Sequence, residues 1–144
     1  MGTNRWQIAL RGPLNSRQIF LLTAAIGLTP IALSYGAAPQ ASLQYLLDLS
    51  ISEVNEKHIF RAIMGLYLAL VAFWILGVFR QSLQTPALYS LVVFMLGLAT
   101  GRVLSLIVDG MPHLLLLVYL LLELVFGTVG VLLLRQPDGD SQHL

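Results

Sequence analysis

The sequence predicts an all-α fold: an integral membrane four-helix bundle with up-down topology and both termini cytoplasmic. Apolar residues make up 57% of the 144 residues and charged residues only 10%, whereas a soluble domain carries about 25% charged residues. Four stretches stay apolar over about 20 residues, the length that a helix needs to cross a bilayer. The arginines gather on one side of these stretches, which gives the bundle a predicted orientation.

The membrane domain is expected to cover residues 19–134, with helices at about 19–38, 59–79, 86–108 and 114–134. Pro30 lies inside the first helix and should kink it, because proline removes a backbone donor. Pro86 opens the third helix, in the first turn, where proline is tolerated. The links between the last three helices are short, so these helices should run antiparallel to their neighbours.

The first connection, residues 39–58, is longer and forms the predicted outer loop. Four residues in it follow helical spacing, which favours a short interfacial helix: Leu43, Leu46, Leu47 and Ser50. A plain extended loop is the alternative, since periodicity alone does not separate the two for so short a run. The run Ser50-Ile-Ser-Glu53 predicts a capping box ahead of the second helix.

Orientation follows from the charged residues. An even number of crossings places five arginines on one side: Arg5, Arg11, Arg17, Arg80 and Arg135. The other side has Lys57 together with four carboxylates: Asp48, Glu53, Glu56 and Asp109. The positive-inside rule therefore makes the basic segment 1–18 and the tail 135–144 cytoplasmic, and the tail is expected to be disordered. Three aromatic residues near the cytoplasmic ends are predicted to form an interfacial belt: Trp74, Phe79 and Tyr89.

A competing interpretation makes the first apolar stretch a cleaved signal peptide. It follows a basic leader and ends in small residues. However, the apolar run is longer than the usual ~7–15 residues, and Pro39 disfavours a cut after Ala38. The sequence therefore favours a first helix that is retained.

Glu123 interrupts the fourth apolar segment near its middle. An ion there costs roughly 2.5–3.5 kcal/mol, so such a residue usually faces other helices and finds a partner. With a rise of ~1.5 Å per residue, Arg102 lies roughly 8 Å and Glu123 roughly 14 Å below the outer surface, within reach of the arginine stem. Arg61 is a second candidate partner, and Asp109 shares a helix face with Arg102. We predict a charge cluster, ligand-binding or structural, of Arg61, Arg102, Asp109 and Glu123.

Small residues next to these charges predict close helix packing. The glycines concerned are Gly65, Gly97, Gly101, Gly127 and Gly130. In the second helix, the stripe expected to face the interior is His58, Arg61, Gly65, Leu68 and Ala72. The residues expected to support the charge cluster are Asn55, His58, Tyr67, Ser105 and Tyr119.

Three interpretations of the charged pair remain open from the sequence. Arg102 and Glu123 form a structural clamp that fixes helix register, or they line a ligand or ion site. In the third, Glu123 is protonated and hydrogen-bonded to Tyr119 or Thr100. A bidentate arginine–carboxylate pair is the cheapest way to keep both charges in the membrane.

The residue inventory disfavours several classes of function. The chain has no cysteine, which removes thiolate metal sites and cysteine nucleophiles. The histidines and carboxylates lack metal-site spacing, so we predict no metal and no cofactor. No phosphate loop, nucleophile elbow or paired carboxylates are present, and an enzyme is therefore disfavoured. The net charge of +1 without a basic stripe argues against nucleic acid as a partner.

Three runs resemble a bacterial family of short four-helix membrane proteins that is catalogued as domain of unknown function 4345. They are Asn55-x-x-His58-Ile-Phe-Arg61 with its continuation to Tyr67, the run from Phe94 to Gly110, and Tyr119-Leu-Leu-Leu-Glu123. The resemblance covers roughly residues 19–134 and implies a four-helix membrane bundle without a known activity. It marks Arg61, Arg102, Asp109 and Glu123 as motif positions. With the charge bias, it implies a multi-pass protein of the bacterial inner (cytoplasmic) membrane.

The leading hypothesis is a small polytopic membrane protein with an outward-facing polar pocket. Arg61 and Arg102 would hold an anionic lipid head group or a small carboxylate, with Glu123 and Asp109 as counter-charges. The alternative is a structural or accessory subunit of a larger membrane complex, in which the charges fix helix register. The expected partners are thus the lipid bilayer, an anionic small molecule, and a membrane-protein partner or homo-oligomer.

Overall fold

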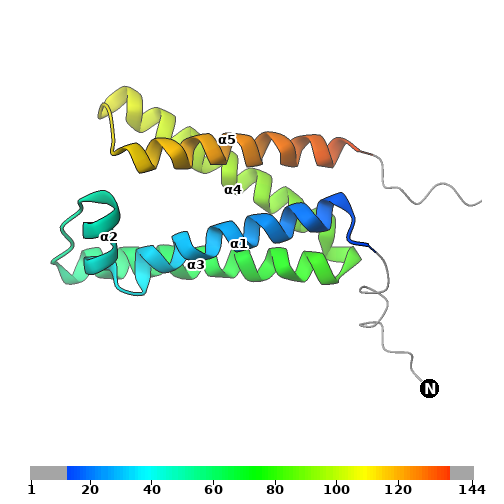
Figure 1. Ribbon diagram of the computed structural model, residues 1–144, viewed down its shortest axis with the longest axis horizontal. Helices are drawn as coiled ribbons and strands as arrows, with labels where there is room; N and C mark the ends of the chain where they lie inside the picture. Colours follow the sequence, from blue (N-terminus) through cyan, green and yellow to red (C-terminus); the bar gives the residue numbers. More distant parts are fainter. Residues whose placement is uncertain (1–12, 137–144) are drawn as a thin grey trace, which may run out of the picture.

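The long helices of the protein form two packed pairs that lie side by side (Figure 1). The computed structural model describes residues 13–136, and the helices within them are α1 (Ser16–Gly36), α2 (Pro39–Leu47), α3 (Val54–Phe79), α4 (Gln81–Val108) and α5 (Leu114–Arg135). α1 packs along α3, α5 packs along α4, and contacts between α3 and α4 join the two pairs. No strand occurs in the described residues. The predicted all-α fold is therefore confirmed.

Every helix except α2 is long and apolar enough to cross a membrane. Lengths of 21 to 28 residues correspond to about 32–42 Å of helix, compared with a hydrocarbon core of about 30 Å. Successive long helices run in opposite directions, so α1 begins and α5 ends at the same end of the bundle (Figure 1). We call this the terminal end and the opposite one the α2 end. The predicted segment 1–18 and tail 135–144 lie largely outside the described residues.

Three helices, α1, α3 and α4, begin earlier than the sequence indicated. α4 begins at Gln81, so Pro86 lies inside the helix rather than in its first turn. Because proline lacks an N–H, only the carbonyl of Ser82 loses its helical partner, and Ser82 is exposed near the helix end. α3 begins at Val54, and the residues ahead of it form the short helix α2 with Pro39 in its first turn. A short helix in this connection is thus confirmed over the extended loop, although Ser50 lies beyond its end.

The cap of α3 differs from the predicted one. The carboxylate of Glu56 accepts hydrogen bonds from the backbone N–H groups of Ser52 and Glu53, at 2.9 and 3.0 Å. The capping box therefore joins Glu53 to Glu56, and the prediction of a box from Ser50 to Glu53 is wrong. A carboxylate in the first helical turn also faces the positive end of the helix dipole, which stabilises this start.

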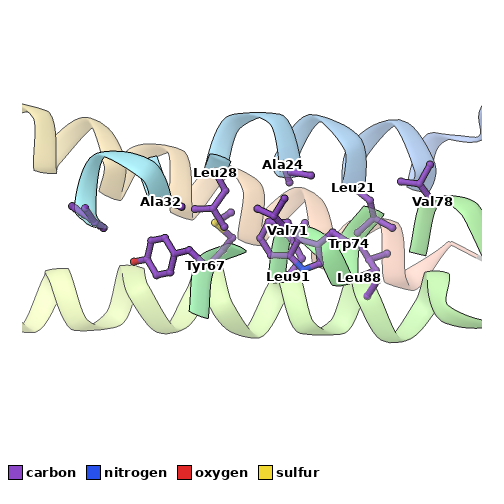
Figure 2. Packing of buried hydrophobic residues seen from close by; sticks show 14 of the residues in the cluster. Leu21, Ala24, Leu28, Ala32, Tyr67, Val71, Trp74, Val78, Leu88 and Leu91 are labelled. Carbon is purple, nitrogen blue, oxygen red and sulfur yellow. The ribbon is translucent and has the colours of Figure 1, made fainter. Parts of the chain in front are cut away.

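The core lies where α1, α3 and α4 meet (Figure 2). Trp74 is 0% exposed there, and its indole N–H donates to the Ser90 hydroxyl at 3.1 Å. The prediction of Trp74 in an interfacial belt is wrong, because the indole finds its polar partner on α4 rather than at the membrane surface. Phe79 and Tyr89 are exposed.

α1 contributes a large share of this core. One face of it is buried against the other helices, at Leu21, Ala24, Leu28 and Ala32. Close approach depends on small residues, because lipid tails supply no hydrophobic drive and helices associate through dispersion contacts. The first helix is thus an integral part of the packed structure.

Candidate ligand site at the Arg102–Glu123 pair

Arg102 of α4 and Glu123 of α5 form an ion pair in the interior. The Nε–H of Arg102 donates to both carboxylate oxygens of Glu123, at 2.9 Å each. Glu123 is 6% exposed, and 21% of the Arg102 side chain is exposed. The predicted pairing of these residues is therefore confirmed. Thr100 donates its hydroxyl proton to the Leu96 carbonyl instead of to Glu123.

Two glycines bring α4 and α5 close together below this pair. A Cβ atom on Gly127 would meet the side chain of Leu96, and one on Gly130 would lie 2.5 Å from Val92. Both glycines share the buried face of α5 with Glu123. The helix pair therefore holds the carboxylate against α4, within reach of the arginine stem. The other three glycines predicted to pack, Gly65, Gly97 and Gly101, have no atom within 4 Å of a Cβ position.

Three tyrosines lie near the Arg102–Glu123 pair. The Tyr119 ring lies beneath the Arg102 guanidinium, with 5.7 Å between Cζ and the ring centroid, a distance at which a cation is attracted to an aromatic face. The Tyr35 side chain is its second polar neighbour. Tyr67 makes an edge contact with Tyr35, with ring centroids 5.9 Å apart. The polar groups around the ion pair thus come from all four long helices.

A cavity of about 90 Å³ adjoins the pair. Besides Arg102, Glu123, Tyr67 and Tyr119, its wall is apolar: Ala24, Gly27, Leu28, Ile31, Phe94, Met95, Leu98, Leu122 and Phe126. One water needs only about 10–15 Å³, so the cavity has room for several heavy atoms. Gly27 on α1 and Leu122 on α5 are both exposed. The cavity therefore reaches the surface between α1 and α5, two helices that contact each other only sparsely.

The guanidinium keeps hydrogen-bonding capacity beyond the ion pair. Glu123 engages only Nε, and within residues 13–136 neither Nη nitrogen of Arg102 bonds a carboxylate. Arg102 also lines a second cavity of about 60 Å³, which extends past Ser105 toward Pro112. These amino groups can donate charge-assisted hydrogen bonds to an acceptor oxygen from either side.

The other predicted site residues lie away from this pair. Asp109 is exposed and accepts a hydrogen bond from the Ser105 hydroxyl at 2.8 Å. Arg61 is exposed and lines a separate depression next to α2. Asn55 and His58 are exposed in the first turns of α3. The structure thus unites Arg102 and Glu123 with two of the supporting residues, Tyr67 and Tyr119. A third, Ser105, lines the second cavity together with Arg102.

The face of α3 that turns inward is not the expected one. Its buried residues are Tyr67, Val71, Trp74, Gly77 and Val78, whereas His58, Arg61, Gly65 and Ala72 are exposed. The aromatic face supplies the contacts that hold α3 in the core. Arg61, close to the helix end, keeps its charge near the interface, as long basic side chains do. Among the described residues, no group of three or more histidines and carboxylates is placed to hold a metal ion.

The described residues form four helices that are long enough to cross a membrane, and these helices enclose a buried ion pair. Both features are typical of a polytopic α-helical membrane protein. The chain belongs to the family described as Domain of unknown function (DUF4345), whose family model matches residues 16–134. This match confirms the family resemblance seen in the sequence. No curated protein and no solved structure matches the chain.

Proposed function

We propose that this multi-pass membrane protein binds a hydrophobic carboxylate, either free or as the head group of a lipid, with Arg102 as the anion-binding residue. The observation that carries the proposal is an arginine at the wall of an apolar cavity whose amino groups donate no hydrogen bond to Glu123. A buried guanidinium of this kind donates paired hydrogen bonds to a carboxylate. The proposal places the protein in the inner (cytoplasmic) membrane, with both termini in the cytoplasm.

The cavity selects for the body of such a ligand. Its wall is aliphatic and aromatic on every side away from the ion pair, with Leu28, Phe94 and Phe126 facing the space. An aliphatic or aromatic body would fill this volume and leave its polar head at Arg102 and the tyrosine hydroxyls. Because the cavity reaches the surface between Gly27 and Leu122, the ligand would enter sideways from the bilayer rather than from water.

Glu123 sets the charge balance of the site. With Arg102 it forms a neutral pair, so a ligand carboxylate would introduce a second negative charge. Two such charges 4 Å apart repel by about 4 kcal/mol at an effective dielectric of ~20. The ligand therefore competes with Glu123 for one guanidinium. Neutralising Glu123 should strengthen the binding of a carboxylate, and removing Arg102 should weaken it.

The test uses quenching of Trp74 fluorescence. The chain has two tryptophans, so a Trp6→Phe background leaves Trp74 alone, and its ring lies 5.9 Å from that of Phe94 in the cavity wall. In nanodiscs, 8-bromooctanoate should quench this fluorescence. Arg102→Gln should raise the dissociation constant for 8-bromooctanoate, measured from this quenching, at least tenfold. This corresponds to about the loss of one charge-assisted hydrogen bond. Glu123→Gln should lower the dissociation constant.

The uncharged analogue 8-bromooctanol provides the matched ligand control. It should quench the wild type and the Arg102→Gln variant alike, because it lacks the carboxylate that the arginine recognises. If the carboxylate and the alcohol bind equally, or if Arg102→Gln leaves carboxylate binding unchanged, Arg102 is not an anion-binding residue. Loss of binding in both variants would indicate a pair that only supports the fold.

A structural or accessory subunit is the second candidate, and the exposure of α5 favours it. Only Glu123, Gly127, Gly130 and Leu133 of this helix are buried, so most of its apolar surface faces away from the bundle. Native mass spectrometry after extraction in mild detergent separates the two candidates. A stoichiometric partner protein on a bundle without a bound small molecule would support the subunit role.

A further inference from the structure

We propose a second anion site, at the α2 end, in which Lys57 and Arg61 of α3 bind a phosphoryl group across from α2. This site shares no lining residue with the cavity at Arg102. It is therefore independent of the function proposed above. The ligand chemistry is a phosphate monoester or diester, carried either by a lipid head group or by a soluble phosphate ester.

The two cations lie one helical turn apart on the same face of α3. Within residues 13–136, neither of them forms an ion pair with a carboxylate. Like charges at this spacing repel each other and destabilise a helix. An anion placed between them would remove the repulsion and accept hydrogen bonds from both side chains.

The surroundings of these cations form a wide depression of about 950 Å³. α2 supplies the opposite wall, with Gln40, Gln44 and Tyr45. Two amides and a tyrosine hydroxyl add neutral hydrogen-bonding groups to the two positive charges. The depression is thus basic and polar, whereas the cavity at Arg102 is mainly apolar.

Four carboxylates lie at the same end of the bundle, but none lines the depression. Asp109 accepts a hydrogen bond from the Ser105 hydroxyl. Glu56 accepts hydrogen bonds from the backbone N–H groups of Ser52 and Glu53. Asp48 accepts one from the Gln44 amide at 2.9 Å. Glu53 is exposed at the cap of α3. These negative charges are committed to local structure, which leaves Lys57 and Arg61 to an external anion.

The level of the site along the bundle fits a phospholipid head group. Lys57 and Arg61 occupy the first two turns of a 26-residue helix that is long enough to cross a membrane. α2 lies at the same level (Figure 1), and its Tyr45 is 89% exposed. Tyrosines and basic side chains at helix ends typically sit among lipid head groups.

The experiment titrates the detergent-solubilised full chain with phosphatidylglycerol and, separately, with sn-glycerol 3-phosphate, and follows adducts by native mass spectrometry. The Lys57→Gln/Arg61→Gln variant should bind phosphatidylglycerol at least tenfold more weakly than the wild type, from two basic contacts near the membrane surface. Arg135→Gln is the matched control, since it removes an exposed positive charge at the opposite end. Helix content by circular dichroism verifies that each variant is folded.

Each outcome decides the proposal. Binding of phosphatidylglycerol alone, weakened by the double variant, assigns the site to lipid head groups. Binding of both probes, weakened alike, assigns it to the phosphoryl group from either source. The proposal is overturned if the double variant binds phosphatidylglycerol as the wild type does. It is also overturned if Arg135→Gln weakens binding as much as the double variant, because the loss then reflects overall charge.

Discussion

Each charge of the Arg102–Glu123 pair is stable in the interior only while the other is present. Glu123 is buried on the face of α5 that meets α4, and both of its oxygens receive the Arg102 Nε–H. If one partner is removed, the other keeps its charge without compensation in a medium of low dielectric. Removing one partner of a buried pair typically costs 3–5 kcal/mol, whereas replacing both with apolar residues is often neutral.

A double-mutant comparison tests this dependence. Arg102→Met and Glu123→Met should each lower the melting temperature and the yield of folded protein, and the Arg102→Met/Glu123→Met variant should recover part of the loss. Methionine suits both sites because it is unbranched and apolar. The measurement is thermal unfolding followed by size-exclusion chromatography in detergent.

An exposed charge supplies the control for that comparison. Arg135→Met removes a positive charge from the last turn of α5, where the side chain is exposed, and should leave the melting temperature nearly unchanged. A double variant no more stable than the worse single variant would show that the two charges do not depend on each other.

At this scale the sequence predicts the charged pair but not its surroundings. A carboxylate and an arginine in apolar segments are recognisable in the sequence, because a charge inside the membrane has a high free-energy cost unless it is paired. The sequence does not single out Tyr35 as a site residue, because a tyrosine near the end of an apolar helix is also common among lipid head groups. Arg61 was expected beside Arg102, but near the end of a helix its charge reaches the interface without turning inward.

A few glycines set the distance between neighbouring helices. At the terminal end, Gly77 of α3 lies against Ala87 of α4, and an added Cβ would be 2.6 Å from the Ala87 Cβ. That neighbour is fixed to the backbone, so relief requires the helices to separate. The contact joins the two helix pairs near the short link between α3 and α4.

The substitution Gly77→Ala should therefore destabilise the bundle by about 1–3 kcal/mol, the usual effect of overpacking. Gly97→Ala is the matched change on α4, where no atom lies within 4 Å of the added Cβ. It should leave the melting temperature unchanged or raise it, since alanine favours a helix over glycine. Equal melting temperatures of the two variants would contradict close packing at Gly77.

Helix existence was predictable here, but helix ends and faces were only partly so. Apolar length identifies the four long helices directly. The start of α4 at Gln81 lies in a polar run without an apolar signal, and Pro86 appeared to be a natural first-turn residue. The inward face of α3 was misjudged because glycine spacing competed with an aromatic face that fills more space.

For the whole molecule, the order of the helices places both described ends together at the terminal end. Sites for chemical labelling can exploit this arrangement, because the chain has no cysteine of its own. Ser52 is exposed at the α2 end and Ser82 at the terminal end. In intact cells, a membrane-impermeant maleimide should label a Ser52→Cys variant, and should label a Ser82→Cys variant only after permeabilisation.

The expected asymmetry rests on the arginines at the terminal end, which the positive-inside rule retains in the cytoplasm. The reverse labelling pattern would invert the proposed orientation. Labelling of both variants in intact cells would contradict a bundle that separates its two ends across a bilayer. Both substituted serines are exposed, so neither change should disturb the packing.

The two helix pairs supply different residues of the site. Arg102 and Glu123 both belong to the α4–α5 pair, whereas Tyr35 and Tyr67 belong to the α1–α3 pair. α1 and α5 contact each other only sparsely. A change in the distance between the two pairs would thus leave the ion pair intact and alter only the side of the cavity that α1 and α3 line. A molecule that contacts both sides would add a second link between the two helix pairs, besides the contact between α3 and α4.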